Sequence, residues 1–272
     1  MSFTAHDHTF AVCAYRDSPY LDACLQSLVA QTVKTRVIIA TSTPTDTVRR
    51  LADAYGFPLF VRDGAPGIAD DWNYAVSCAE TPLVTLAHQD DTYEPAYAQR
   101  MLDAMSRVER PLIYFTDYGE IRDGVALDEN RLLEVKRMML APLRDGRHAR
   151  SRFVRRRILA MGSAICCPSV TMYRPALSDP PFEHTFKNNL DWDAWERFSR
   201  LEGSYYYDAR ILMHHRIHEG SETSNLIADD TRTQEDVRML ERFWPVPIAR
   251  LINVAYRTSQ RSNASGAHGG GV

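Results

Sequence analysis

Residues 9–41 read TFAVCAYRDSPYLDACLQSLVAQTVKTRVIIAT, which contains a buried-strand pattern, a helical pattern and a second buried-strand pattern. The runs at 9–14 and 36–40 are short and almost wholly apolar, as is typical of strands covered on both faces. Between them, Ser18-Pro19 is typical of a helix N-cap followed by proline at the first helical position. Apolar residues then follow at helical spacing, namely Leu21, Cys24, Leu25, Leu28 and Val29. The stretch therefore predicts a strand–helix–strand unit.

The same alternation continues as far as residue 118. Further helices are expected to start at Thr43-Pro44, to span 69–79 and to start at Glu94-Pro95. Further strands are expected at 58–61, 83–87 and 112–116. This alternation predicts an α/β fold with a mostly parallel central sheet flanked by helices. Such sheets bind ligands beyond the carboxyl ends of their strands, so residues 15–17, 41–43 and 88–91 are the first candidates for a site.

The second half of the chain is less regular. Its expected elements are a strand at 165–173, a helix at 188–201, a strand at 205–213, and one or two helices within 227–256. Residues 144–157 carry seven arginines in fourteen positions. This run is either a solvated helix face or a contact for an anionic acceptor or a membrane surface. The polar, glycine-rich residues 259–272 predict a mobile tail.

Composition limits the classes of function. Hydrophobic residues make up 44% of the 272 residues and charged residues 25%, an ordinary globular balance, and the net charge of -3 gives no reason to expect a nucleic-acid partner. The five cysteines are Cys13, Cys24, Cys78, Cys166 and Cys167, with no CxxC pair, so we expect reduced thiols in a cytoplasmic protein. The sequence shows no signal-peptide pattern and no apolar run of about 18 residues that would span a membrane.

Three groups of residues can carry chemistry. Asp90-Asp91 follow a buried strand and are either ligands for Mg²⁺ or Mn²⁺ or a solvated turn. In LDWDAWERF (190–198), two acids and two tryptophans are either a helix start or a catalytic acid with aromatic faces for sugars. In HHRIHEGS (214–221), four basic or imidazole side chains in five positions predict a loop that binds phosphate oxygens; a zinc site or a plain polar loop are the alternatives.

Taken together, these motifs resemble the family 2 glycosyltransferases of the GT-A fold, from about Phe10 to Ser224. AVCAYRDSPYLDACLQSLVAQT (11–32) is similar to the family's first strand and helix, and RVIIATSTPTD (36–46) to its second strand and Asp-Gly-Ser turn. GIADDWNYAVSCAETPLVTLAHQDDTYEP (67–95) is similar to the helix, strand and DxD segment. LDWDAWERF resembles the catalytic-base segment, and HHRIHEGSETS (214–224) resembles the late Arg-x-His-x-x-Ser segment near the diphosphate.

The chain departs from the family pattern at two places. Thr41-Ser42 stand where the family often has an acid that contacts the base or ribose. His88 replaces the first acid of the DxD motif, so that Asp90 matches the motif's last acid, the usual metal ligand, and Asp91 follows it.

The resemblance implies an inverting transfer of a sugar from a nucleotide-sugar to a hydroxyl acceptor, in cell-surface polysaccharide or glycoconjugate synthesis. It implies Asp191 as the general base, with Asp193 in reserve, Trp192 and Trp195 at the acceptor, and Asp90 and Asp91 at a divalent Mn²⁺ or Mg²⁺. The implied donor-binding residues are Ala14, Tyr15, Arg16, Thr41, Asn73, His88, Gln89, Asp90, Arg216, His218 and Ser221.

The expected organisation is a GT-A domain at 1–226, a C-terminal helical extension at 227–258 and a flexible tail at 259–272. Within the domain, the nucleotide-binding half is about 1–118 and the acceptor half about 119–226. The expected partners are a UDP- or dTDP-sugar and a saccharide or lipid-linked saccharide. The sequence leaves open a homodimer and a peripheral contact with the inner face of the membrane.

Two other classes of protein share parts of this pattern. A nucleotidyltransferase of related fold would usually carry a glycine-rich phosphate loop near the first strand, which CAYRDSPYL (13–21) is not. A non-catalytic sugar-binding protein would need neither a metal site nor Asp191. Metal-dependent hydrolysis of a nucleotide-sugar distinguishes the three.

Overall fold

The computed structural model describes residues 2–218 and 230–254. The strands are β1 His8–Ala14, β2 Arg36–Thr41, β3 Leu59–Val61, β4 Leu83–His88, β5 Thr92–Tyr93, β6 Pro111–Arg122, β7 Val125–Leu127, β8 Val170–Tyr173 and β9 Ser204–Ile217. The helices are α1 Leu21–Val29, α2 Asp46–Tyr55, α3 Ile68–Ser77, α4 Tyr97–Arg107, α5 Arg131–Leu140, α6 Arg152–Arg157, α7 Leu190–Ser199 and α9 Asp230–Leu240, followed by helical residues 246–254. Short 3-10 turns are η1 Ala5–Asp7, η2 Ala141–Leu143, η3 Cys167–Ser169 and η4 Arg174–Ala176.

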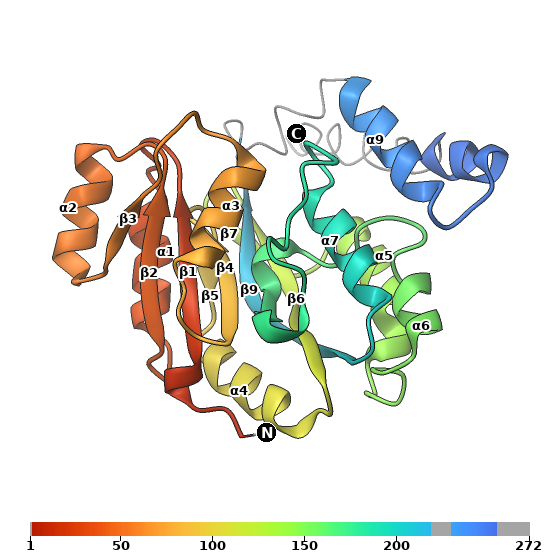
Figure 1. Cartoon of the computed structure of the whole chain (residues 1–272), viewed down its shortest axis with the longest axis horizontal. Helices are drawn as coiled ribbons and strands as arrows, with labels where there is room; N and C mark the ends of the chain where they lie inside the picture. Colours follow the sequence, from red (N-terminus) through yellow and green to blue (C-terminus); the bar gives the residue numbers. More distant parts are fainter. Residues whose placement is uncertain (1, 219–229, 255–272) are drawn as a thin grey trace, which may run out of the picture.

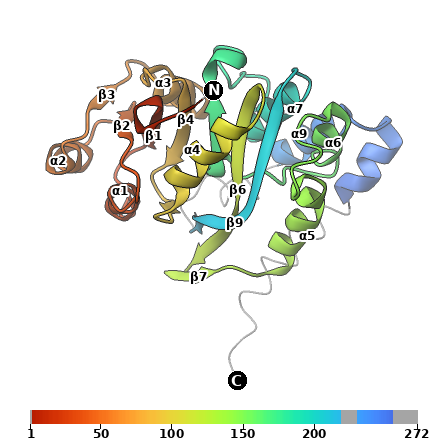
Figure 2. The same ribbon diagram turned by 90° about the horizontal axis from the view of Figure 1, so that it is seen from below.

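One continuous sheet runs through both halves of the chain, in the order β3-β2-β1-β4-β8-β6-β9-β5, with β7 paired to β6 (Figure 1). Strands β3, β2, β1 and β4 are all parallel, β8 runs antiparallel to β4 and β6, and β9 is parallel to β6. Figure 2 shows helices on both sides of this sheet. The predicted α/β class with a C-terminal helical extension is confirmed, although the part beyond β4 is mixed rather than parallel.

The topology brings the ends of three strands together. Cys13 of β1 lies opposite His88 of β4, so the turns that follow these two strands are neighbours. The far end of β9 reaches the same place, because β5, which follows the β4 turn, pairs Thr92 with His214. Residues 14–20, 88–91 and 214–218 therefore meet at one edge of the sheet.

Several element boundaries differ from the sequence prediction. Helix α1 begins at Leu21 rather than at Ser18-Pro19. The Ser18 hydroxyl accepts from the Tyr20 amide at 3.2 Å and donates to Asp90 at 2.7 Å. Helix α2 is capped by Thr45, whose Oγ1 accepts from the Val48 amide, and not by Thr43.

Two predicted elements of the second half were wrong in extent. The strand expected at 165–173 begins only at Val170, because the proline-containing turn η3 precedes it. The supposed loop that begins at His214 is the end of β9 as far as Ile217, where it pairs with β6. Gly119 on β6 makes this close pairing feasible, since a Cβ there would lie 2.6 Å from the His214 ring.

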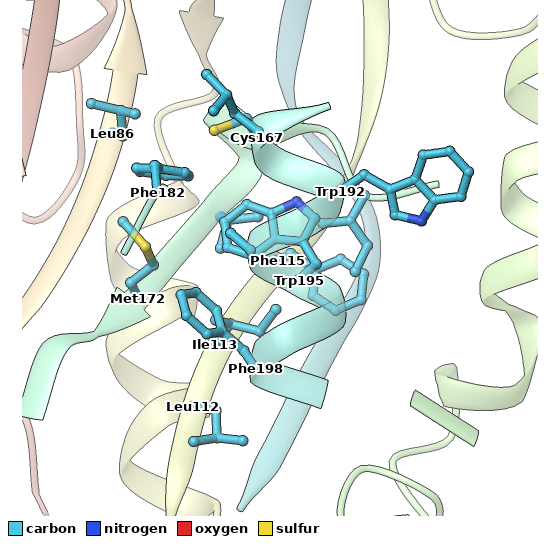
Figure 3. Close-up of a cluster of buried hydrophobic side chains, with 14 of the residues drawn as sticks. Leu86, Leu112, Ile113, Phe115, Cys167, Met172, Phe182, Trp192, Trp195 and Phe198 are labelled. Carbon is cyan, nitrogen blue, oxygen red and sulfur yellow. The ribbon is translucent and has the colours of Figure 1, made fainter. Parts of the chain in front are cut away.

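The apolar core lies on both faces of the sheet, in two clusters of buried side chains. One cluster fills the space between the sheet and α7, where Figure 3 shows Trp195 among Phe115, Phe182 and Phe198. Among the described residues, no helix is long and apolar enough to span a lipid bilayer. All five cysteines are free thiols.

Candidate active site

Asp90 is the centre of the site, on the turn between β4 and β5. Its Oδ1 accepts a hydrogen bond from the Ser18 hydroxyl at 2.7 Å, and its Oδ2 lies 3.3 Å from Nε2 of His218. Its carbonyl oxygen accepts from Nε of Arg216 at 3.0 Å. The Asp90 side chain is 24% exposed, so solvent and ligands can reach it. The structure thus brings the predicted Asp90, Arg216 and His218 together, although more than a hundred residues separate Asp90 from the other two.

Tyr20 supports the two basic side chains of this cluster. The Arg216 guanidinium lies 4.4 Å from the centre of the Tyr20 ring, and the His218 ring lies 4.9 Å from it. A guanidinium over an aromatic face gains an attractive electrostatic contact and loses conformational freedom. Ser18 and Tyr20 were not predicted as site residues, because the Ser18-Pro19 pattern was interpreted as a helix start.

Asp91 has a different position from Asp90, since its side chain is fully buried. Its Oδ1 accepts from Nδ1 of His215 and from the backbone amide of Arg216, both at 2.9 Å. Burial would raise the pKa of the Asp91 carboxyl, but the charge and hydrogen bond of His215 outweigh it, and the pKa lies below its usual value. Burial would likewise lower the pKa of His215, and the Asp91 carboxylate reverses this, so the pKa of His215 lies above 6.5. The pair fixes the end of β9 against the β4 turn.

Replacing Asp91 with asparagine is expected to lower the pKa of His215 below 6.5, since burial and the charge of Lys136 then outweigh the smaller effect of the remaining carboxylate, Glu120. In the wild type, the lowered pKa of Asp91 stabilises the fold at pH values above 3.8, and the raised pKa of His215 stabilises it at pH values below 6.5. The contribution of the pair to the free energy of unfolding is therefore largest between pH 3.8 and pH 6.5. The variant should lose about 1–3 kcal/mol of stability in that window. NMR titration of His215 and thermal unfolding as a function of pH measure both effects.

Asp128→Asn is the matched control for this prediction. Asp128 lies 2.9 Å from Nε2 of the neighbouring His214, but its side chain is 59% exposed. Exposed ion pairs contribute about 0–1 kcal/mol, so this variant should unfold almost as the wild type does. Equal losses in the two variants would contradict a special role for the buried Asp91–His215 pair.

The turn after β1 forms the other wall of the site. The Gln89 side-chain amide pairs with the backbone of Tyr15 in both directions, at 2.9 and 3.0 Å, next to Ala14 at the end of β1. Arg16 adopts a left-handed backbone (φ 53) and its amide donates to Thr43 Oγ1 at 2.5 Å. A non-glycine residue in this region is strained, and such strain is often found at binding sites.

His88 occupies the position of the family's first DxD acid, and the structure stacks it on Trp72 with ring centres 4.9 Å apart. Burial lowers the pKa of His88, so the ring is neutral at physiological pH. The negative charge expected from a standard motif is therefore absent at this position. Trp72, in helix α3, was not among the predicted site residues.

The remaining predicted donor residues have mainly structural contacts. Thr41 is buried, and its Oγ1 accepts from the Thr43 amide at 3.0 Å. The Asn73 amide exchanges two hydrogen bonds with the backbone of Phe182, at 2.7 and 3.0 Å. Ser221 lies outside the described residues.

A carboxylate that the sequence analysis missed lies next to the end of β2. Asp71 accepts from the Ser42 hydroxyl at 3.0 Å and from Nε of Arg62 at 2.8 Å. An acid therefore reaches this strand end from α3, although the family's acid at the strand itself is replaced by Thr41-Ser42.

Asp191 lies in the first turn of α7, where its Oδ1 accepts from the Trp192 amide at 2.7 Å. Burial raises the pKa of the Cys166 and Cys167 thiols well above their usual range, and the charges of both Asp91 and Asp191 add to this effect. Both carboxylates thus act electrostatically on the same pair of thiols.

The start of α7 is held by the C-terminal helix α9. Glu235 accepts from the backbone amides of Lys187 and Asn188, both at 2.8 Å, and Asp236 accepts from the Asn189 side chain at 2.8 Å. Both acids are almost fully buried. The C-terminal extension thus fixes the residues that lead directly into Asp191.

The structure corrects the expectation for the other residues of this segment. Asp193 is fully buried and forms ion pairs with Arg197 at 2.8 Å and Arg242 at 2.7 Å, which gives it a structural role. Trp192 and Trp195 are 1% and 0% exposed (Figure 3). A sugar ring cannot stack on either indole without displacing the core, so the acceptor role predicted for them was wrong.

Within residues 2–218 and 230–254, no three His, Cys, Asp or Glu side chains form a group that could hold a metal ion by themselves. Asp90 Oδ2 and His218 Nε2 lie 3.3 Å apart, at hydrogen-bond distance. Two ligands of one Mg²⁺ ion, each about 2.1 Å from it, lie about 3 Å from each other. A shared divalent ion would therefore fit this spacing if the hydrogen bond were given up, and water and phosphate oxygens would have to fill its other positions.

Comparison with solved structures identifies the fold. A mannosyltransferase from Pyrobaculum calidifontis matches with a TM-score of 0.60 and 13% identity, over 98% of this chain and 76% of that chain. S. aureus TarS 1–349 matches with a TM-score of 0.59 and 14% identity, over 91% and 69%. Glucosyl-3-phosphoglycerate synthase from Mycobacterium tuberculosis matches with a TM-score of 0.54 and 15% identity, over 87% and 80%. These proteins share the GT-A fold with this chain.

The sequence comparisons concern the family. A search of curated proteins found no match. The model of the family described as "Glycosyl transferase family 2" matches residues 9–179, a segment that contains Asp90 and most of the sheet. Because this match covers well over half of the chain, the protein belongs to glycosyltransferase family 2.

Proposed function

We propose that this protein is an inverting, metal-dependent glycosyltransferase that transfers a sugar from a nucleotide-sugar to a hydroxyl acceptor. The observation that carries the proposal is the cluster at the sheet edge, where Asp90 lies within 3.3 Å of His218 and Arg216 is held over Tyr20. An acid, an imidazole and a guanidinium at strand carboxyl ends suit a metal-bound diphosphate.

Asp90 and His218 are proposed to hold the divalent ion. The ion would supply positive charge to neutralise the diphosphate as it leaves. Asp91 is buried and paired with His215, so we assign it to positioning Arg216 and His218 rather than to metal binding. His88 contributes a neutral ring beside the site rather than a second carboxylate.

Two residues would act on the two sides of the anomeric carbon, Arg216 at the leaving group and Asp191 at the acceptor. Arg216, fixed by Asp90 and Tyr20, donates hydrogen bonds to the phosphate oxygens, and their charge grows as the bond to the anomeric carbon breaks. Asp191, fixed by the first turn of α7, accepts the proton of the acceptor hydroxyl as its oxygen attacks that carbon from the opposite side. Attack opposite to the leaving group inverts the anomeric configuration.

The donor is proposed to be a nucleotide-sugar, with UDP- or dTDP-sugars the first to test. TarS is described in complex with UDP-GlcNAc and with UDP, the Pyrobaculum mannosyltransferase with GDP-Man and Mn²⁺, and the mycobacterial synthase with UDP and Mn²⁺. In this chain, Tyr15, Arg16 and Asp71 are the proposed lining of the nucleoside pocket. The acceptor is proposed to be a saccharide or lipid-linked saccharide used in cell-surface polysaccharide synthesis, at a cytoplasmic location that the five free thiols favour.

The proposal is tested by measuring the thermal stability of the full chain with a panel of nucleotide-sugars, with and without Mn²⁺. A ligand that binds only the native state raises the melting temperature, and a concentration of 100 Kd contributes about 2.7 kcal/mol. We expect one nucleotide class to stabilise the protein, and more strongly with Mn²⁺. If no nucleotide-sugar shifts the melting temperature under either condition, the proposal fails.

Arg216→Ala is expected to weaken binding of the nucleoside diphosphate about 10- to 100-fold, since a hydrogen bond to a charged group contributes roughly 1.5–3 kcal/mol. Binding of the bare nucleoside should change little, because Arg216 contacts the Asp90 turn and not the end of β2. Calorimetry with both ligands measures the two affinities. Arg122→Ala is the control, because Arg122 lies on the neighbouring strand and pairs with Glu120. Equal losses for diphosphate and nucleoside in Arg216→Ala would indicate a structural role.

A further inference from the structure

Basic charge is concentrated in two stretches of a chain whose net charge is -3. Residues 146–161 contain six arginines and no aspartate or glutamate, and residues 242–254 contain two arginines and again no acid. Four of these eight arginines form ion pairs with acids outside the two stretches, namely Arg147, Arg150, Arg156 and Arg242, and Arg155 is buried. The arginines that remain are Arg152, Arg157 and Arg250. Neither stretch contributes a residue to the site around Asp90. The first contains α6, and the second contains the last helical residues that the structure describes.

The same stretches expose large apolar side chains. Thirteen large hydrophobic side chains of the described residues are exposed, and six of them lie here: Phe153 (73%), Met161 (47%), Val246 (44%), Ile248 (43%), Leu251 (70%) and Val254 (62%). Single exposed apolar side chains are ordinary, but a group of them beside basic residues indicates an interaction surface.

Contacts between the two stretches join them into one surface. The Arg157 guanidinium lies 4.4 Å from the centre of a Trp244 ring, and the indole Nε1 of Trp244 donates to the Ala160 carbonyl at 2.6 Å. Phe153 is four residues before Arg157 and therefore lies on the same face of α6. Figures 1 and 2 both show α6 and the C-terminal helices along the same outer edge of the molecule.

The last helical segment, residues 246–254, has both apolar and basic side chains on its exposed side. Val246, Arg250 and Val254 follow at intervals of four residues, with Leu251 beside them, so these side chains share one side of the helix. Ala249 is buried on the other side. We define the α6/C-terminal surface as Phe153, Met161, Val246, Ile248, Leu251 and Val254 together with Arg152, Arg157 and Arg250.

We propose that the α6/C-terminal surface binds the anionic surface of a lipid bilayer. Exposed aliphatic and aromatic side chains can enter the boundary between headgroups and acyl chains, while arginines pair with anionic headgroups. A second copy of the chain fits less well, because a two-fold symmetric contact would bring the arginines of both copies into one interface, and the α6/C-terminal surface contains no acid to pair with them. The inference does not depend on the transferase activity.

Flotation of the full chain with vesicles tests this surface. One set of vesicles is phosphatidylcholine alone and the other is enriched in phosphatidylglycerol, each at low and at high salt. We expect binding to the phosphatidylglycerol vesicles that weakens at high salt, because exposed charges are screened. The double variant Phe153→Asp/Leu251→Asp should bind at least about tenfold more weakly, since it removes two apolar contacts and adds two negative charges.

The matched control is Val125→Asp/Leu127→Asp. It introduces the same charges at exposed apolar positions of β7, at 59% and 38% exposure, outside the α6/C-terminal surface. It should bind as the wild type does, and thermal unfolding checks that both double variants are folded. No binding of the wild type at low salt, or equal losses in both double variants, would overturn the proposal. The proposal would also be overturned if light scattering showed a dimer that Leu251→Asp dissociates and flotation showed no binding to vesicles.

Discussion

Asp191→Asn is expected to slow sugar transfer at least about a hundredfold while leaving donor and metal affinity near the wild-type values. Asparagine keeps the shape of the side chain and can still accept from the Trp192 amide, so the first turn of α7 should be retained. What it loses is the ability to take a proton from the acceptor hydroxyl. Donor affinity by calorimetry and turnover on the same preparation separate these two properties.

Asp193→Asn distinguishes catalysis from stability in the same helix. Asp193 is fully buried in ion pairs with Arg197 and Arg242, so its replacement should lower the melting temperature while the folded fraction keeps substantial activity. If Asp191→Asn turns over normally and folded Asp193→Asn is inactive, the base has been assigned to the wrong acid. If both remain active, this segment does not carry the base.

Asp90→Ala is expected to abolish the Mn²⁺-dependent part of nucleoside-diphosphate binding. The variant removes the carboxylate that lies nearest to His218 and that is open to solvent. His218→Ala should have the same effect in a weaker form, since the carboxylate supplies the charge that a divalent ion requires. Calorimetric titration with the diphosphate, with and without Mn²⁺, measures the difference.

Asp17→Ala is the control for the metal prediction. Asp17 lies one residue before Ser18, but its carboxylate accepts from Thr45 at 2.6 Å and faces α2. Its loss should leave metal-dependent binding unchanged. Undiminished metal-dependent binding in folded Asp90→Ala would exclude Asp90 as the ligand.

The first half of the fold could be predicted because each of its elements is specified locally. Strands β1, β2 and β4 are apolar runs between helical patterns, and their parallel pairing follows from that alternation. The second half depends on contacts between distant segments. Strand β9 continues to Ile217 only because β6 offers a partner as far as Arg122, and a sequence rich in histidine and arginine gives no sign of this pairing.

Candidate site residues could be predicted from the sequence where a charged or imidazole side chain follows a strand. Asp90, Arg216 and His218 were proposed on this basis, and the structure places them together. Ser18 and Tyr20 were missed because Ser18-Pro19 is also the pattern of a helix start. Their place in the site is shown only by the contacts of Ser18 with Asp90 and of Tyr20 with Arg216. Trp192 and Trp195 were misassigned because a tryptophan beside an acid can bind a sugar or fill a core, and only burial decides between the two.

The most direct test of the central claim is the release of nucleoside diphosphate from the nucleotide-sugar that stabilises the protein, measured for the wild type, Asp90→Ala and Asp17→Ala. The account predicts release by the wild type and by Asp17→Ala that requires Mn²⁺ or Mg²⁺, and no metal-dependent release by Asp90→Ala. Release by Asp90→Ala at the wild-type rate, or none by the wild type with any nucleotide-sugar and acceptor saccharide, would contradict a donor site built around Asp90.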